Sequence, residues 1–428
     1  MNRYGLAGMA LGILAPAGFA NNGETDKAVD LAPLQEEMIN INFKPGSGIT
    51  FDGGDSYSLN LRGGLIFRYE AASTDDGIGG PGSNNTSNTF DVRSARIMLG
   101  GHIFDRKTRF MLSLEGSRDF YSTNTAATGL PRSPVKDAYV ERDMMQMEAM
   151  KLMVGLGQMR TLYGRETNGT EYGKAAGEFT LAGRTFSGQR NRGLAVSLVD
   201  NDDKWRVNLG LWNSDQAGGS GYSNEDGPNW DNELSYSLSA RFDPAGSLGD
   251  STFTTLDHAH SEAFLWGIGA GIFIGNQTVG NTPGGADVEQ MQYNFNFAFK
   301  TQGWGGLAEL YFSSQEIQGA ANSVDDMGWS VLVNYSMDNG WTVGGQVSSV
   351  SNDPSQAGNT GIRPVNPTGT SYTGEGDTME YGIFVSRDYN NVANHRVILE
   401  FLGQNVDQET PSVSDTNLIL RATYVLVF

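Results

Sequence analysis

Apolar and polar residues alternate along most of this chain. In the last eleven residues, 418–428, apolar side chains occupy every second position, and Arg421 and Thr423 lie between them. Because successive side chains of a β-strand point to opposite faces, this period of two predicts a strand with one apolar face. The same pattern predicts sixteen strands, at 57–69, 89–104, 108–118, 134–142, 150–159, 191–200, 203–214, 232–243, 262–274, 289–301, 304–315, 326–337, 341–350, 377–388, 394–405 and 415–428.

The connections between these strands alternate between long and short. Long connections lie at 71–88, 120–133, 160–190, 214–231 and 352–376, and short ones at 105–107, 201–202, 301–303 and 338–340. The segment 244–261 is an exception, because it is long where a short turn is expected. Bacterial outer-membrane barrels have long extracellular loops and short periplasmic turns. We therefore expect an all-β chain that forms a 16-stranded antiparallel transmembrane β-barrel.

Three tryptophans favour the same interpretation. Trp205, Trp304 and Trp341 each follow a predicted short turn. At these positions an indole can bury its ring in lipid and donate a hydrogen bond among the headgroups. The alternative is that they are ordinary core residues at strand starts.

The first 47 residues lie outside the strand pattern. A basic start at Met1–Arg3, an apolar run over 6–15 and a small-x-small motif within 17–20 predict a signal peptide, 1–20, cleaved before Asn21. The apolar run is shorter than the roughly 20 residues that a spanning helix needs. Residues 21–47, with a short predicted helix at 27–38, are expected to form a periplasmic leader of unassigned role. The barrel domain is then 48–428.

Composition excludes several classes of function. The chain has no cysteine, which excludes disulfides and thiolate metal sites, and its net charge of -20 argues against nucleic-acid partners. The 57 glycines and 44 Phe, Tyr and Trp residues fit many turns and aromatic girdles. His258 and His260 resemble a metal-site fragment, but we interpret them as part of a solvated loop. No spacing indicates a catalytic triad, so we expect no enzyme, no metal and no cofactor.

Three blocks of sequence resemble the phosphate-selective porin O/P family. They are 90–104, 137–140 and 154–166, and the resemblance is clearest over residues 57–200. It implies a trimeric, passive diffusion channel of a Gram-negative-type outer membrane. We expect the solutes to be small and polar or charged, with anions such as phosphate among the candidates. It also implies that the loop 160–190 folds into the lumen. Phosphate-selective members have lysine and arginine clusters along the pore, whereas this chain has only eight lysines, so phosphate itself does not follow.

Strand parity indicates which charged side chains face the interior. A lipid-facing arginine at the membrane midplane costs roughly 2–4 kcal/mol, so inward placement is favoured. Arg241, Arg396 and Arg421 are expected to point inward by the same argument. The candidate pore-lining residues, from strands and from the loop 160–190, are Arg62, Arg68, Arg96, Arg109, Glu115, Arg160, Arg165, Glu166, Arg184 and Arg206.

The arginines are unevenly distributed, since fifteen of the 21 lie between Arg62 and Arg206. Two interpretations follow. A basic wall facing the loop 160–190 would create a transverse field that orders polar solutes. Alternatively, the arginines pair with carboxylates and hold the loop against the wall.

Many acidic residues fall in predicted extracellular loops, where they would attract cations or bind divalent ions at the surface lipid. The sequence therefore leaves the preference for anions or cations open. A competing interpretation is a non-channel outer-membrane barrel that acts as an adhesin or receptor.

Overall fold

The computed structural model describes thirteen segments of the chain. They are residues 39–44, 46–74, 86–117, 135–169, 171–186, 190–213, 234–248, 255–278, 287–317, 323–352, 376–389, 395–409 and 412–428. The predicted signal peptide and the predicted helix 27–38 lie outside these residues. Within the described segments, no helix is both long and apolar enough to cross a membrane.

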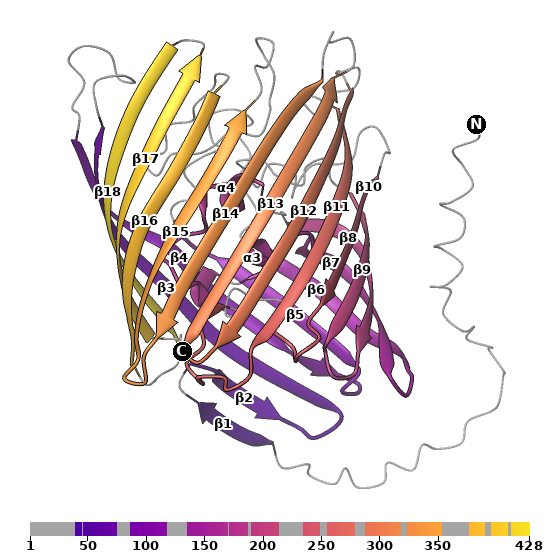
Figure 1. The fold of residues 1–428 in the computed structure, drawn as a ribbon. Helices are drawn as coiled ribbons and strands as arrows, with labels where there is room; N and C mark the ends of the chain where they lie inside the picture. Colours follow the sequence, from indigo (N-terminus) through magenta and orange to yellow (C-terminus); the bar gives the residue numbers. More distant parts are fainter. Residues whose placement is uncertain are drawn as a thin grey trace, which may run out of the picture. The chain divides into compact units, whose positions relative to one another are not determined.

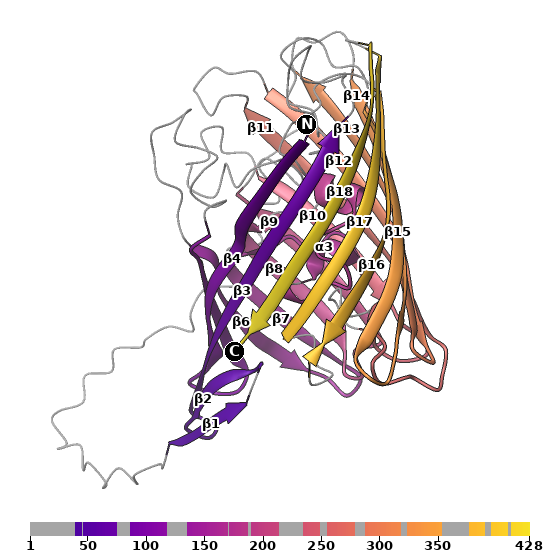
Figure 2. The ribbon, with the colours of Figure 1, turned by 90° about the vertical axis from the view of Figure 1, so that its left-hand side faces the viewer.

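Sixteen antiparallel strands form a closed barrel, in which each strand pairs with its neighbours in the chain and β18 pairs with β3 (Figures 1 and 2). The strands are β3 (Tyr57–Thr74), β4 (Thr86–Ile103), β5 (Thr108–Glu115), β6 (Val135–Gln146), β7 (Met150–Arg160), β8 (Arg190–Asp200), β9 (Trp205–Trp212), β10 (Ser235–Phe242), β11 (Leu265–Thr278), β12 (Asp287–Thr301), β13 (Trp304–Ile317), β14 (Val324–Ser336), β15 (Trp341–Asn352), β16 (Gly376–Asp388), β17 (His395–Glu409) and β18 (Ser412–Val427). Each corresponds to one of the sixteen predicted segments, so the predicted fold class is confirmed. The ends differ by up to five residues, as where β3 continues to Thr74.

The two faces of the barrel wall have opposite character. In β10 burial alternates at every residue, with Ser237 and Ser239 buried and Leu238 half exposed. In β18, Arg421 is 2% exposed and Leu420 is 51% exposed. The outward face is thus largely apolar, as the period of two predicts, and the inward face carries most of the buried polar side chains together with apolar ones such as Phe273 and Ile419.

The strand connections divide between two rims. The short turns 104–107, 147–149, 201–204, 302–303 and 337–340 lie at one rim, together with the C-terminal Phe428, and we call this the turn rim. The described parts of the connection between β10 and β11, residues 243–248 and 255–264, lie at the same rim. Trp304 and Trp341 begin their strands there and are 50% and 38% exposed.

An additional hairpin, which we call the rim hairpin, precedes the barrel. It consists of β1 (Asn40–Lys44) and β2 (Gly48–Asp52), and β2 pairs with the start of β3 through Ile49↔Leu61 and Phe51↔Leu59. Figures 1 and 2 show it at the turn rim, beyond the end of β18. The sequence pattern assigns residues 40–47 to a leader, so it does not predict this hairpin.

Candidate functional site

The connection between β7 and β8 enters the barrel interior, and we call residues 161–189 the inner loop. Its described residues form α3 (Arg165–Asn168), a 3-10 turn η1 (Glu171–Gly173) and α4 (Leu181–Thr185). Both views draw α3 within the ring of strands. Tyr163, Leu181 and Phe186 are at most 1% exposed, so the inner loop packs as firmly as a protein core.

Glycines on the wall provide the space for this packing. A Cβ atom on Gly271 of β11 would lie 2.2 Å from the carbonyl oxygen of Tyr163. A Cβ atom on Gly328 of β14 would lie 2.4 Å from the ring of Phe186. Phe186 also stacks on Tyr311 of β13, with the ring centroids 5.3 Å apart. The inner loop can therefore approach the wall only because these inward positions lack side chains.

Glu309 of β13 holds the start of α3. Its carboxylate accepts hydrogen bonds from the backbone N–H of Arg165 at 2.7 Å and of Glu166 at 3.1 Å. These are two of the N–H groups that a helix N-terminus leaves without intrahelical partners, and a negative charge there is favourable. The Arg165 guanidinium extends to Asp243, with Nη2 2.9 Å from Oδ1.

Glu166 points into the inner loop. Its carboxylate accepts hydrogen bonds from the backbone N–H of Thr180 at 2.8 Å and from the Thr180 hydroxyl at 2.6 Å. Burial raises the pKa of this carboxyl above its usual value. Thr180 in turn caps α4 by accepting a hydrogen bond from the Gly183 N–H. Glu166 therefore links the two helices of the inner loop.

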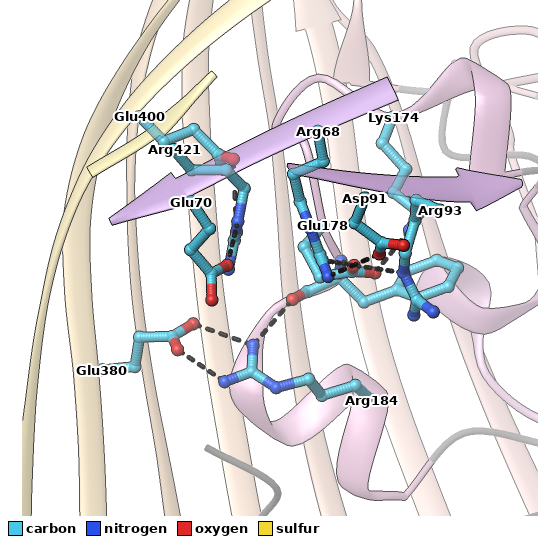
Figure 3. A network of polar contacts seen from close by, with 11 residues as sticks. Arg68, Glu70, Asp91, Arg93, Lys174, Glu178, Arg184, Glu380, Glu400 and Arg421 are labelled. Atoms are coloured by element: carbon cyan, nitrogen blue, oxygen red, sulfur yellow. Dashed lines mark hydrogen bonds and ion pairs between the residues drawn. The ribbon is translucent and has the colours of Figure 1, made fainter. Parts of the chain in front are cut away.

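A second wall carboxylate, Glu380, holds α4, as Figure 3 shows. The Arg184 guanidinium donates to both carboxylate oxygens of Glu380 on β16, and Glu380 is 1% exposed. The backbone N–H of Ala182 donates to the Ser348 hydroxyl on β15 at 2.8 Å. A bidentate arginine–carboxylate pair fixes orientation as well as distance.

Glu178 of the inner loop forms ion pairs with three cations, also shown in Figure 3. Its carboxylate lies 3.2 Å from Arg68 of β3, 3.1 Å from Arg93 of β4 and 3.0 Å from Lys174 of the inner loop. Burial raises the pKa of this carboxyl, but the three cations outweigh burial and hold the pKa well below 4.5. The arginine side of the wall is thus joined to the inner loop by one buried carboxylate.

Other interior arginines pair with carboxylates along the wall. Arg96 lies 3.0 Å from Glu115, and both side chains are nearly fully buried. Arg421 lies between two carboxylates of neighbouring strands, Glu70 at 3.0 Å and Glu400 at 3.2 Å. Arg109 pairs with Glu141 and Asp143. Several described arginines therefore hold the inner loop or brace the wall, as the second interpretation expects.

The ten predicted site residues fall into two groups. The buried residues are Arg96, Glu115, Arg165 and Glu166, and the half-buried residues are Arg62, Arg68, Arg109, Arg160, Arg184 and Arg206. The structure gathers Arg68, Arg165, Glu166 and Arg184 at the inner loop, and Arg160 also donates to its backbone at Gly169. Arg62 makes no ion pair with any described residue. That the half-buried arginines line a pore stays a prediction.

The wall carboxylates that hold the inner loop were not predicted. Glu309 and Glu380 lie on β13 and β16, and Asp243 directly follows β10, so all three are far from the inner loop in sequence. Strand parity can place such a side chain inside the barrel, but it gives no height along the barrel axis. Inward parity was therefore the one available signal, and it could not show which carboxylates meet the inner loop.

The segment 255–264 at the turn rim also differs from expectation. Asp257 is 2% exposed and accepts hydrogen bonds from Ser261 and from the Gly303 N–H. His258 Nε2 lies 2.9 Å from Asp388 Oδ2, and the Asp388 side chain is fully buried. The interpretation as a solvated loop is therefore wrong for His258, which packs against the wall. His260 is 26% exposed and lies 3.1 Å from the exposed Asp338, so that part of the segment does face solvent. No group of three metal-binding side chains occurs among the residues that the structure describes.

Comparison with protein-family models and with curated proteins finds no match to this sequence, so the resemblance to the phosphate-selective porin O/P family stays a prediction. Solved structures do share the fold. An anion-selective porin from Comamonas acidovorans is 10% identical, and the alignment covers 87% of this chain and 100% of that chain with a TM-score of 0.54. The outer membrane channel DcaP of Acinetobacter baumannii is 12% identical over 87% of this chain and 98% of that chain, with a TM-score of 0.51.

Proposed function

We propose that this chain is an outer-membrane porin, a passive diffusion channel for small polar or charged solutes. The observation that carries the proposal is the closed barrel of sixteen strands with an apolar outer face, a polar interior and an inner loop. An apolar exterior suits lipid and a polar interior suits water, which is the arrangement of barrels that cross an outer membrane. Two solved structures that share the fold are an anion-selective porin and an outer-membrane channel, which supports this location.

The interior has polar groups that water can satisfy. Gln292 of β12 is fully buried, and neither atom of its amide has a hydrogen-bond partner among the described residues. Buried amides without partners are costly, and ordered water is the usual remedy. The half-buried Arg62 and Arg206 face the same interior. Together these side chains favour a hydrated path beside the inner loop.

Selectivity and assembly belong to the same proposal. The half-buried arginines favour anions, phosphate among them, whereas acidic loops favour cations at the outer mouth. A homotrimer in contact with membrane lipid and surface lipid follows from the family resemblance. The predicted signal peptide would deliver the chain to the outer membrane.

Conductance of the refolded chain in a planar bilayer, with a KCl gradient across it, tests the proposal. Stepwise currents are expected, and the sign of the reversal potential distinguishes anion from cation preference. A folded barrel that produces no current at any protein concentration would contradict the channel function.

A second candidate is a barrel without a channel, acting as an adhesin or receptor. The close pairing in the interior favours it, since Glu178, Glu309 and Glu380 each hold the inner loop firmly. Release of the inner loop distinguishes the two candidates. If the Glu178→Gln barrel conducts and the native barrel does not, the native interior is closed and the second candidate is correct.

A further inference from the structure

The rim hairpin displays apolar side chains outside any core. Ile39, Ile41 and Phe43 are 53%, 68% and 63% exposed, and every residue of β1 is exposed. β1 pairs with β2 along one edge, and its other edge is the outer edge of the hairpin in Figures 1 and 2. An exposed apolar edge strand is normally blunted or covered, because it promotes aggregation. We therefore expect this face to be covered in the working protein.

The apolar residues of the hairpin continue the outward face of the barrel wall. Phe43 pairs with Ile49 and Ile49 with Leu61, so the three side chains share one face of the sheet. Leu61 belongs to the outward face of β3 and is 37% exposed. The polar residues of β1 and β2 lie on the opposite face. The rim hairpin thus extends the apolar exterior beyond the end of β18.

The hairpin is fixed to the barrel by side-chain contacts as well as by strand pairing. His102 of β4 contacts the Ser58 hydroxyl at 2.8 Å and the Gly54 carbonyl oxygen at 3.1 Å. Arg106, in the turn after β4, lies 2.7 Å from Asp55. The turn that joins β2 to β3 is therefore tied to the neighbouring turn of the rim.

That neighbouring turn presents an aromatic side chain in a strained backbone conformation. Phe104 has a φ of 68° and is 83% exposed. A bulky residue in the left-handed region is uncommon, and such strain persists where a function maintains it. An aromatic ring displayed at a barrel rim is typical of the membrane interface. Phe104 is thus a second sign that this part of the turn rim meets lipid.

We propose that the rim hairpin is a membrane-interface anchor whose apolar face lies on the lipid headgroup layer at the turn rim. The inference rests on the proposed outer-membrane location, and it adds a lipid contact outside the barrel wall. The outer edge of β1 fits the interface and not the hydrocarbon, because its backbone groups need water or headgroups as partners. The occupant is lipid because the apolar face is continuous with the lipid-facing wall.

The absence of cysteine from the sequence gives a direct test. Phe43→Cys and Ile41→Cys place a single thiol on the apolar face, and Asn42→Cys is the matched control on the opposite face. Each variant of the full chain carries a polarity-sensitive fluorophore and is reconstituted into phosphatidylethanolamine–phosphatidylglycerol vesicles. Nitroxide-labelled lipid and aqueous iodide then serve as quenchers.

We expect the labels at 41 and 43 to emit at shorter wavelength and to be quenched several-fold more by nitroxide lipid than the label at 42. Iodide should show the reverse order. Equal quenching at the three positions would overturn the proposal. A signal at 43 that depends on protein density, with cross-links between copies, would overturn it in favour of a second copy as the occupant.

The channel function is read separately in the same vesicles, from solute efflux and from the heat-modifiable band of the folded barrel. Lipid quenching without efflux would support the proposed membrane-interface anchor and contradict the channel function. Efflux without lipid quenching would support the channel function and contradict the proposed membrane-interface anchor.

Discussion

Glu178 is the residue whose removal tests most directly how the inner loop is held. Its carboxylate contacts Arg68, Arg93 and Lys174 at 3.0–3.2 Å. Glu178→Gln keeps the shape of the side chain and removes the charge. The three cations then repel one another, although Arg68 keeps a second carboxylate partner, Asp91 at 3.3 Å.

The expected magnitude follows from the burial of this cluster. The Glu178 side chain is 10% exposed, and Lys174 is 5% exposed. Removing one partner of a buried ion pair costs about 3–5 kcal/mol, because the charge that remains loses its compensation. At about 1.4 kcal/mol for each factor of ten, opening of the inner loop should become on the order of 10² to 10⁴ times more frequent.

Hydrogen exchange of the loop amides measures this change. The N–H groups of Thr180 and Ala182 are bonded in the packed inner loop, so their exchange rates report its opening. Glu148→Gln is the matched control, since Glu148 is an exposed acid in a turn. A change of less than about tenfold in Glu178→Gln, or an equal change in the control, would refute the reasoning.

Three further outcomes are expected. Gly271→Ala brings a Cβ atom within 2.2 Å of the Tyr163 carbonyl oxygen and should lower the free energy of unfolding by about 1–3 kcal/mol, measured by a heat-dependent gel shift. Gly100→Ala is the control and should be neutral, because its Cβ atom lies 3.4 Å from Met111 Cε. Folding lowers the pKa of Glu178, so the stabilisation that this carboxylate provides is present above about pH 4.5 and is lost as the pH falls through the lower folded value. The excess of current fluctuations in Glu178→Gln over the native chain should therefore be constant at neutral pH and shrink only below about pH 4.5. An excess that shrinks near pH 6 would contradict this. Arg62→Ala should shift the reversal potential toward cation preference, whereas Arg96→Ala should mainly reduce heat stability, by about 3–5 kcal/mol, because the buried Glu115 loses the cation at 3.0 Å and keeps Lys136 at 3.9 Å.

The barrel was predictable because each strand carries its own signal. Alternation in β18, for example, places Leu420 and Arg421 on opposite faces without reference to any other part of the chain. The rim hairpin was missed although Ile41 and Phe43 alternate with polar residues. A run of five residues before Pro45 is short, and the interpretation of 21–47 as a leader included it.

The candidate site was predictable only in part. Parity placed Arg68 and Arg96 inside the barrel, but it could not choose between water and a carboxylate as their partner. That choice depends on the strand register and on the path of the inner loop, which bring Glu178 beside Arg68 across 110 residues of sequence. Inward glycines on β11 were an available sign that backbone packs against that strand.

Two strands share one edge of β3, and this bears on how the barrel closes. β18 and the terminal Phe428 pair with residues 63–74 of β3, and β2 pairs with residues 58–61, nearer the turn rim. Arg62 alone separates the two. Because β2 is close to β3 in sequence, it can pair before the last strand arrives. The final strand is then blocked by β2, because it cannot shift toward the turn rim along β3 without displacing β2. The rim hairpin would thereby set the register at which the cylinder is sealed, and with it the stagger and the width of the barrel.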